Sequence, residues 1–116
     1  MKRIDTKLMG IDQGELVLFS DFEKGGAMWT GEGERTRLHT VRFTERFRNI
    51  PAVHCALSMW DIDSRTNARM EVSAEAITEA GFEVSFRTWA DTRIARARVR
   101  WMAIGEVHHE DDWDLY

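Results

Sequence analysis

Apolar and polar residues alternate along most of the second half of the chain, as they do in half-buried β-strands. In the segment 67–78, every second residue from Met70 to Ala76 is apolar, and the residues between them are Glu or Ser. The same alternation runs through 82–88 and 94–104. The period of two fits these segments better than the helical period of 3.6, so we expect three strands here.

Three further strands are predicted in the first half. Residues 14–20 form a short apolar run, residues 38–47 alternate in part, and Pro51 opens an alternating segment that runs to Asp63. Proline is tolerated at the first position of a strand, and Glu79-Ala80-Gly81 is a plausible hairpin turn. Six strands at hairpin spacing predict an all-β fold, a six-stranded antiparallel β-sandwich.

The chain has 116 residues, which is enough for one domain. We expect this domain to cover residues 1–107 and to be followed by an acidic tail at 108–116. Cys55 is the single cysteine, so no internal disulfide can form, and its parity predicts an inert buried thiol. We find no signal peptide and no stretch of membrane-spanning length, which predicts cytoplasmic synthesis and no membrane insertion, with a surface or particle location left open.

Charge and motif spacing narrow the function classes. The formal net charge of −4 gives no general case for nucleic-acid binding. His108, His109 and the acids that follow are adjacent on a tail, where residues rarely converge on one ion, so we expect no metal and no cofactor. No Ser, His and Asp set has a recognisable catalytic spacing, so we expect no enzyme.

The last three predicted strands each carry one charged face. If they are neighbours, acids and arginines lie opposite each other, and such cross-strand pairs stabilise a sheet. Three arginines at alternate positions of the last strand also repel one another, and the planar guanidinium suits interface pairing. A solvated face and an oligomer contact are therefore both open. The residues concerned are Glu71, Glu75, Glu83, Arg87, Arg96, Arg98 and Arg100.

An ordered set of residues between positions 43 and 105 resembles the H-type lectin domain, the family of snail agglutinins and of the C-terminal domain of slime-mould discoidins. The pattern is a proline-led strand ending in an aspartate, an Asn-x-Arg, a Gly-Phe strand, a Thr-Trp turn, and a final strand with Trp and Ile. The matching residues are Pro51, Asp61, Asn67, Arg69, Gly81, Phe82, Thr88, Trp89, Trp101 and Ile104.

The resemblance implies a homotrimer with a galactose or N-acetylgalactosamine site between subunits, and whether two trimers stack as a dimer of trimers is left open. Arg69 stands where the family's arginine grips sugar hydroxyls, and Trp89 stands where its tryptophan contacts the sugar. Glu32 or Glu34 would supply the carboxylate that accepts hydroxyl hydrogen bonds. The resemblance therefore predicts a carbohydrate-binding module.

Two positions depart from the family pattern. Ala90 stands where the sugar binders often have a histidine, and Ala95 where an aromatic residue is expected. The alternative function is a structural or assembly protein, such as a component of a phage-like particle or fibre, that keeps the fold and trimer without sugar binding. Trp29, in a glycine-rich loop, is interpreted as a loop plug rather than a pocket wall, and Trp60 is expected to face outward.

Overall fold

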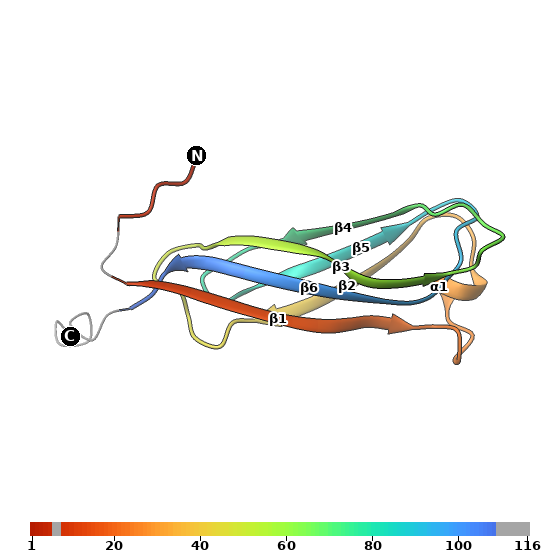
Figure 1. Ribbon diagram of the computed structural model, residues 1–116, viewed down its shortest axis with the longest axis horizontal. Helices are drawn as coiled ribbons and strands as arrows, with labels where there is room; N and C mark the ends of the chain where they lie inside the picture. The colour runs from red at the N-terminus through yellow and green to blue at the C-terminus, as the bar shows by residue number, and fades with distance from the viewer. Residues whose placement is uncertain (6–7, 109–116) are drawn as a thin grey trace.

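The computed structural model describes residues 1–5 and 8–108 and consists almost wholly of β-strands that run along its long axis (Figure 1). The acidic tail expected at 108–116 lies outside the described residues except for its first position. In the part of the chain that is described, no helix is long and apolar enough to span a bilayer. The elements are β1 (Met9–Ser20), α1 (Ala27–Thr30), β2 (Arg35–Arg42), β3 (Ala52–Ile62), β4 (Met70–Glu75), β5 (Gly81–Thr88) and β6 (Ile94–Glu106).

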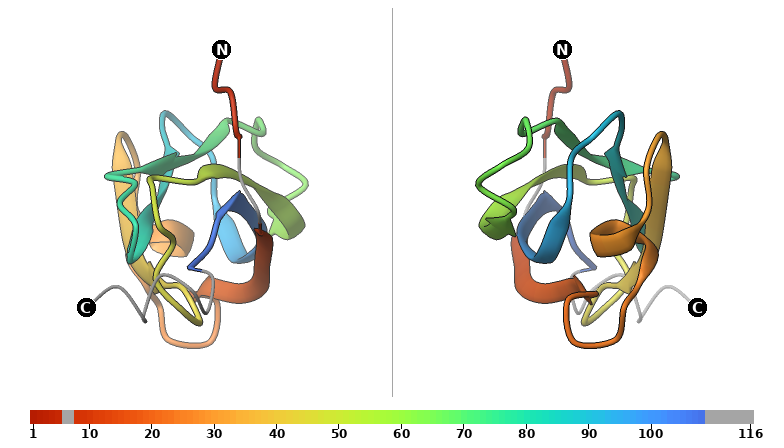
Figure 2. Two further views of the ribbon diagram at one scale, coloured as in Figure 1. Left: turned by 90° about the vertical axis from the view of Figure 1, so that its left-hand side faces the viewer. Right: turned by 90° about the vertical axis from the view of Figure 1, so that its right-hand side faces the viewer.

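The strands form two antiparallel three-stranded sheets, which confirms the predicted six-stranded sandwich. One sheet has the order β1-β6-β3 and the other the order β2-β5-β4. End-on views show the two sheets as separate layers, with α1 at one end (Figure 2). Each sheet buries one face in the shared core, which accounts for the alternating pattern of the sequence.

Phenylalanines and small aliphatic residues from both sheets fill the core. Phe86 and Val84 of β5 and Val99 of β6 are fully buried. At the end away from α1, Trp101 packs against Phe82 with ring centroids 5.4 Å apart. The expected inward position of Trp101 is thus confirmed, and the expected outward position of Trp60 is confirmed by its 56% exposure.

Three strands differ in extent from the sequence prediction, and one of them is β4, which covers Met70–Glu75 instead of 67–78. β1 begins at Met9 instead of Gly14, because the added residues pair with the end of β6, from Met9 opposite Glu106 to Gln13 opposite Met102. β2 ends at Arg42, and the chain then leaves the sheet. Phe43 and Phe47 still enter the core, where their rings meet edge to face at 5.0 Å. The apolar spacing of Phe43 and Phe47 therefore led to a predicted strand end that lies too far along the chain.

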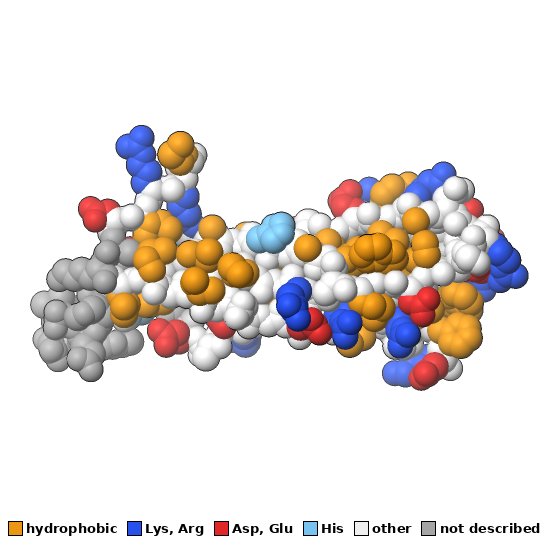
Figure 3. Space-filling model, viewed as in Figure 1, with side chains coloured by type: hydrophobic (Ala, Val, Ile, Leu, Met, Phe, Trp, Pro, Cys, Tyr) orange, Lys and Arg blue, Asp and Glu red, His pale blue; other side chains and the backbone are white. Residues whose placement is uncertain are grey.

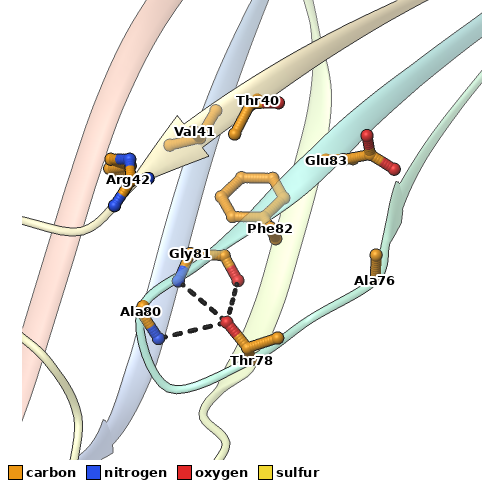
Figure 4. A pocket seen from close by; sticks show the side chains of 9 residues that line it. All are labelled: Thr40, Val41, Arg42, Ala76, Thr78, Ala80, Gly81, Phe82 and Glu83. Atoms are coloured by element: carbon orange, nitrogen blue, oxygen red, sulfur yellow. Dashed lines mark hydrogen bonds between the residues drawn. The ribbon is translucent and has the colours of Figure 1, made fainter.

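The turn between β4 and β5 is held by a threonine. The hydroxyl of Thr78 donates to the carbonyl oxygen of Gly81 and accepts the N–H groups of Ala80 and Gly81, at 3.2 to 3.3 Å (Figure 4). A Cβ on Gly81 would lie 2.1 Å from the carbonyl oxygen of Val41 on β2, so only glycine fits this close approach. The predicted hairpin turn is confirmed.

The expectation that the last three strands share one charged face is wrong. β6 is the central strand of the other sheet, so its arginines lie on the opposite outer face from the charged residues of β4 and β5. Their acids come from the same chain: Arg98 and Arg100 lie 3.3 and 3.0 Å from Glu15, and Arg96 lies 3.3 Å from Asp61. Mutual repulsion along β6 is thus offset within one subunit.

Cys55 is only half-buried, although its side chain packs against the core as predicted. This burial raises the pKa of its thiol. The thiolate is therefore disfavoured, in keeping with the inert role that we expected.

Candidate functional site

The register of β2, β5 and β4 brings three of the predicted site residues to one end of their sheet. Arg35, Thr88 and Met70 lie side by side across the three strands. One residue beyond them are Glu34, Trp89 and Arg69, which by strand alternation lie on the outer face. This end of the sandwich is the one that carries α1 (Figure 1).

The backbone of Arg69 is clamped between two buried threonines. The hydroxyl of Thr88 donates to the carbonyl oxygen of Arg69 at 2.5 Å, and the N–H of Arg69 donates to the hydroxyl of Thr92 at 3.0 Å. Thr88 and Thr92 are fully buried. Arg69 therefore starts from a fixed backbone while its guanidinium remains partly exposed.

Asp91 receives that guanidinium, with Nη1 of Arg69 2.8 Å from its Oδ1. The backbone N–H and the side-chain amide of Asn67 lie 3.4 Å from the other carboxylate oxygen. Partial burial opposes ionisation of Asp91, but the hydrogen bonds from Asn67 and the charge of Arg69 outweigh it and lower the pKa of Asp91. The Asn-x-Arg stretch and the turn after Trp89 thus meet as one charged unit.

Trp89 is half-buried and lies outside the hydrophobic core. The guanidinium of Arg87 stands 4.6 Å from the centroid of its ring. Arg87 also pairs with Glu34 at 3.4 Å and with Glu71 at 3.5 Å. An indole, two arginines and three carboxylates therefore share this end of the outer face.

The remaining predicted residues are distributed unevenly. Ala90 is exposed at a left-handed backbone position, with φ of 58°, and its carbonyl oxygen accepts the N–H of Gly33 at 2.9 Å. Glu32 is exposed on the same loop as Gly33. Ala95 lies on β6 in the other sheet, where it lines a separate hollow with Phe22. One chain thus gathers Glu34, Trp89, Arg69 and Ala90, whereas Ala95 lies elsewhere.

Residues 38–104, more than half of the chain, match the H-type lectin domain. The chain belongs to the H-type lectin domain family. It is 52% identical over 107 residues to a protein of Fuscovulum blasticum called ATP synthase subunits region ORF 7, a match that covers 92% of this chain and 93% of that protein. That name describes a gene region and does not mention sugar.

Two solved structures of discoidin II from Dictyostelium discoideum share the fold. The native recombinant form superposes with a TM-score of 0.74 at 22% identity, over 90% of this chain and 40% of that chain. The wild-type form has the same TM-score and identity, over 87% and 38% of the two chains. The lectin domain thus spans about 40% of the length of discoidin II, and at this identity the likeness shows the fold alone.

Arg35 of the lectin domain is a buried residue that joins several backbone segments, and the sequence did not point to it. Its side chain points inward from β2 and lies within hydrogen-bonding distance of five backbone carbonyl oxygens, at 2.8 to 3.5 Å. Burial lowers the pKa of Arg35, and the charge of Glu32 opposes that shift. The one signal in the sequence was an arginine at a position whose side chain points inward from a strand. The carbonyl groups belong to Ala27, Met28, Gly33, Ala90 and Thr92.

Asp63 secures the loop between β3 and β4 that leads to Arg69. The backbone N–H and Nε of Arg65 each donate to one carboxylate oxygen at 3.0 Å, and Nη2 donates to the other at 2.8 Å. Arg93 adds a positive charge 3.7 Å away. The hydrogen bonds from Arg65 are the main cause that lowers the pKa of Asp63 from 3.8 to about 2.

This shift predicts an acid-sensitive loop. Because the pKa is lower in the folded state, the stabilisation is fully present above pH 3.8 and is lost as the pH falls towards about 2. In Asp63→Asn, the free energy of unfolding, measured by urea denaturation, should therefore fall less steeply across that window than in the unmodified protein. Ser64→Ala, at the exposed neighbouring position, is the control and should keep the original slope. Equal slopes in Asp63→Asn and the unmodified protein would contradict this role of Asp63.

Proposed function

We propose that this lectin domain is a non-catalytic carbohydrate-binding module for galactose- or N-acetylgalactosamine-type glycans. The observation that carries the proposal is the clamped Arg69, whose guanidinium lies at the same end of the outer face as the half-buried indole of Trp89. Ligand sites commonly combine a flat apolar wall with a few directional polar groups. A sugar ring has the matching chemistry, because it has an apolar face and a rim of hydroxyl groups.

Each side chain then has a distinct role. Trp89 stacks on the apolar face of the ring, Arg69 donates to hydroxyl oxygens, and Asp91 and Glu34 accept hydroxyl hydrogens, with Glu32 on the adjoining loop. Arg87 covers one face of the indole in the free chain and has Glu34 and Glu71 as partners to which it can turn. The small side chain of Ala90 leaves the site open, so we infer weak binding of single sugars and better binding of larger glycans.

We further propose that the domain assembles as a homotrimer and that the outer face of the β1-β6-β3 sheet takes part in the contact. Ile11 is 65% exposed and Val17 is 56% exposed on this face, with Met102 also exposed. Hydrophobic side chains gather over one half of the face and near its other end, with charged side chains between them (Figure 3). Exposed apolar patches of this kind mark interaction sites.

This assembly revises the interface expected from the charge pattern. Arg98 and Arg100 lie on the proposed contact face beside Glu15, whereas Arg96 lies at the α1 end of the sheet, outside the proposed contact. The acids Glu71, Glu75 and Glu83 and the base Arg87 belong to the other sheet, whose outer face ends at the proposed sugar site. In a ring of three, contacts are heterologous, so an edge of that second face can also border a neighbouring subunit.

A second function is supported by the pairing of the site residues with one another. Arg87 covers one face of the Trp89 indole, and Arg69 is paired with Asp91. In the free chain, these groups therefore already have partners. A structural or assembly protein, such as a component of a phage-like particle or fibre, would keep these pairs. Trimer formation without any glycan binding would favour this second function.

Sugar binding predicts that Trp89→Ala abolishes glycan binding and barely changes the unfolding temperature. The reason is that an exposed or peripheral ring can be removed at little cost, whereas truncating a core Trp costs about 3–5 kcal/mol. Binding would be measured on a glycan array and by calorimetry with the best array ligand. Leu38→Ala, at an exposed residue on the same sheet but away from the site, is the control and should bind normally. Failure of the unmodified trimer to bind any galactose-type glycan would overturn the proposal.

The assembly proposal predicts that Met102→Glu converts the trimer into monomers. A charge buried without a partner costs several kcal/mol, whereas an exposed charge costs about 1 kcal/mol or less. Light scattering coupled to size exclusion would report the mass at micromolar concentration. Leu38→Glu places the same charge on the opposite outer face and should remain trimeric. A monomeric unmodified protein, or equal behaviour of the two variants, would contradict the proposed face.

A further inference from the structure

The hollow lined by Ala95 is separate from the Arg69 and Trp89 site and has binding features of its own. It lies at the α1 end of the β1-β6-β3 sheet, where Ser20, Arg96 and Asp61 are side by side across the three strands. Its volume is about 360 Å³, which is within the range of small-ligand pockets. The side chains around it come from β1, the segment after β1, α1, β3 and β6.

One side of the hollow is aromatic. Phe22 and Trp29 meet edge to face, with ring centroids 5.0 Å apart and planes at 78°. Phe22 is 59% exposed, so its ring is accessible from the hollow. The interpretation of Trp29 as a loop plug is therefore incomplete, because the ring packs against its neighbours and also lines the hollow.

This aromatic wall is held in place by the backbone and by Arg93. The N–H of Phe22 donates to the carbonyl oxygen of Ala95 at 3.1 Å. The guanidinium of Arg93 lies 4.7 Å from the Trp29 ring centroid, and its Nε donates to the carbonyl oxygen of Trp29 at 2.7 Å. A wall that is already ordered loses little conformational entropy when a ligand binds.

The rim of the hollow is polar and supplies donors and acceptors side by side. Nε of Arg96 lies 3.3 Å from Oδ2 of Asp61, and both side chains are more than half exposed. Ser20 adds a hydroxyl and Glu23 a second carboxylate. An adjacent guanidinium and carboxylate match neighbouring hydroxyl groups, since each hydroxyl can both accept and donate a hydrogen bond.

The floor of the hollow depends on a small residue. Ala95 is 7% exposed, and its carbonyl oxygen also accepts the N–H of Asp21 at 2.7 Å, so the backbone here is fixed. A methyl side chain at this position leaves space between the aromatic wall and the Asp61–Arg96 pair. The hollow thus has an apolar wall, a small floor and a charged rim.

We propose that this hollow is a second saccharide-binding site, in which a pyranose ring packs against Phe22 and Trp29 and places neighbouring hydroxyls on Asp61 and Arg96. It lies on the opposite sheet from the Arg69 and Trp89 site and shares no lining residue with it. The proposal does not rest on the proposed function, because each site has its own indole. Two separate sites on one chain would let a branched glycan, or two glycans, engage the same end of the domain.

The indole N–H signals of Trp29 and Trp89 allow one nitrogen–proton NMR titration to report both sites. The probes are galactose, N-acetylgalactosamine and glucose. We expect a saturable shift of the Trp29 signal that persists in Trp89→Ala and weakens at least tenfold, about 1.4 kcal/mol, in Phe22→Ala and in Asp61→Asn. Leu38→Ala is the matched control at an exposed apolar residue of the other sheet and should leave the titration unchanged.

Three results would overturn the second site. No saturable shift of Trp29 with any of the probes would exclude it, whether or not Trp89 responds. Loss of the Trp29 shift in Trp89→Ala would show that the two residues belong to one site. A Trp29 shift that follows protein concentration and ignores sugar would assign the hollow to self-association. Shifts at Trp29 with none at Trp89 would support this proposal while counting against the proposed function.

Discussion

A single buried guanidinium holds the functional end of the domain together. Arg35 cannot lose its proton under ordinary conditions, so the fold must surround the charge with acceptors. In the described structure these are backbone carbonyl groups of three separate segments: the start of α1, the loop before β2 and the turn between β5 and β6. Burying a charge without partners costs several kcal/mol, so these segments and the arginine order one another.

Both proposed ligand sites depend on that arrangement. On one side, Arg35 binds the carbonyl groups of Ala90 and Thr92, and Thr92 in turn holds the backbone of Arg69. On the other side, it binds the carbonyl of Met28, the residue before Trp29. The segments that carry Trp89 and Trp29 therefore share one anchor.

Sequence periodicity indicated on which face of its sheet a side chain lies, but it did not indicate which strands pair with each other. Alternation correctly separated inward Trp101 from outward Trp60, because that pattern depends only on the local pleat. It did not show that β6 leaves β5 and joins β1 and β3, since strand pairing is decided by contacts that are distant in sequence. The charged rows of β5 and β6 were therefore combined on one face. Ala95 was grouped by the family resemblance with a tryptophan that lies on the other sheet. The family resemblance selected Arg69 and Trp89, which lie at one end of one sheet. Arg35 was missed because its role depends on three segments that meet only after folding.

Amide hydrogen exchange in Arg35→Met tests the organising role of this arginine most directly. Methionine keeps an apolar stem of similar length and removes the donors that hold the carbonyl groups. If Arg35 organises this end, exchange should become faster at Gly33, whose N–H bonds to Ala90, and at Arg69, whose N–H bonds to Thr92, while Val84 in the core stays protected. Unchanged protection at Gly33 and Arg69, or an equal loss at Val84, would contradict the local anchoring role.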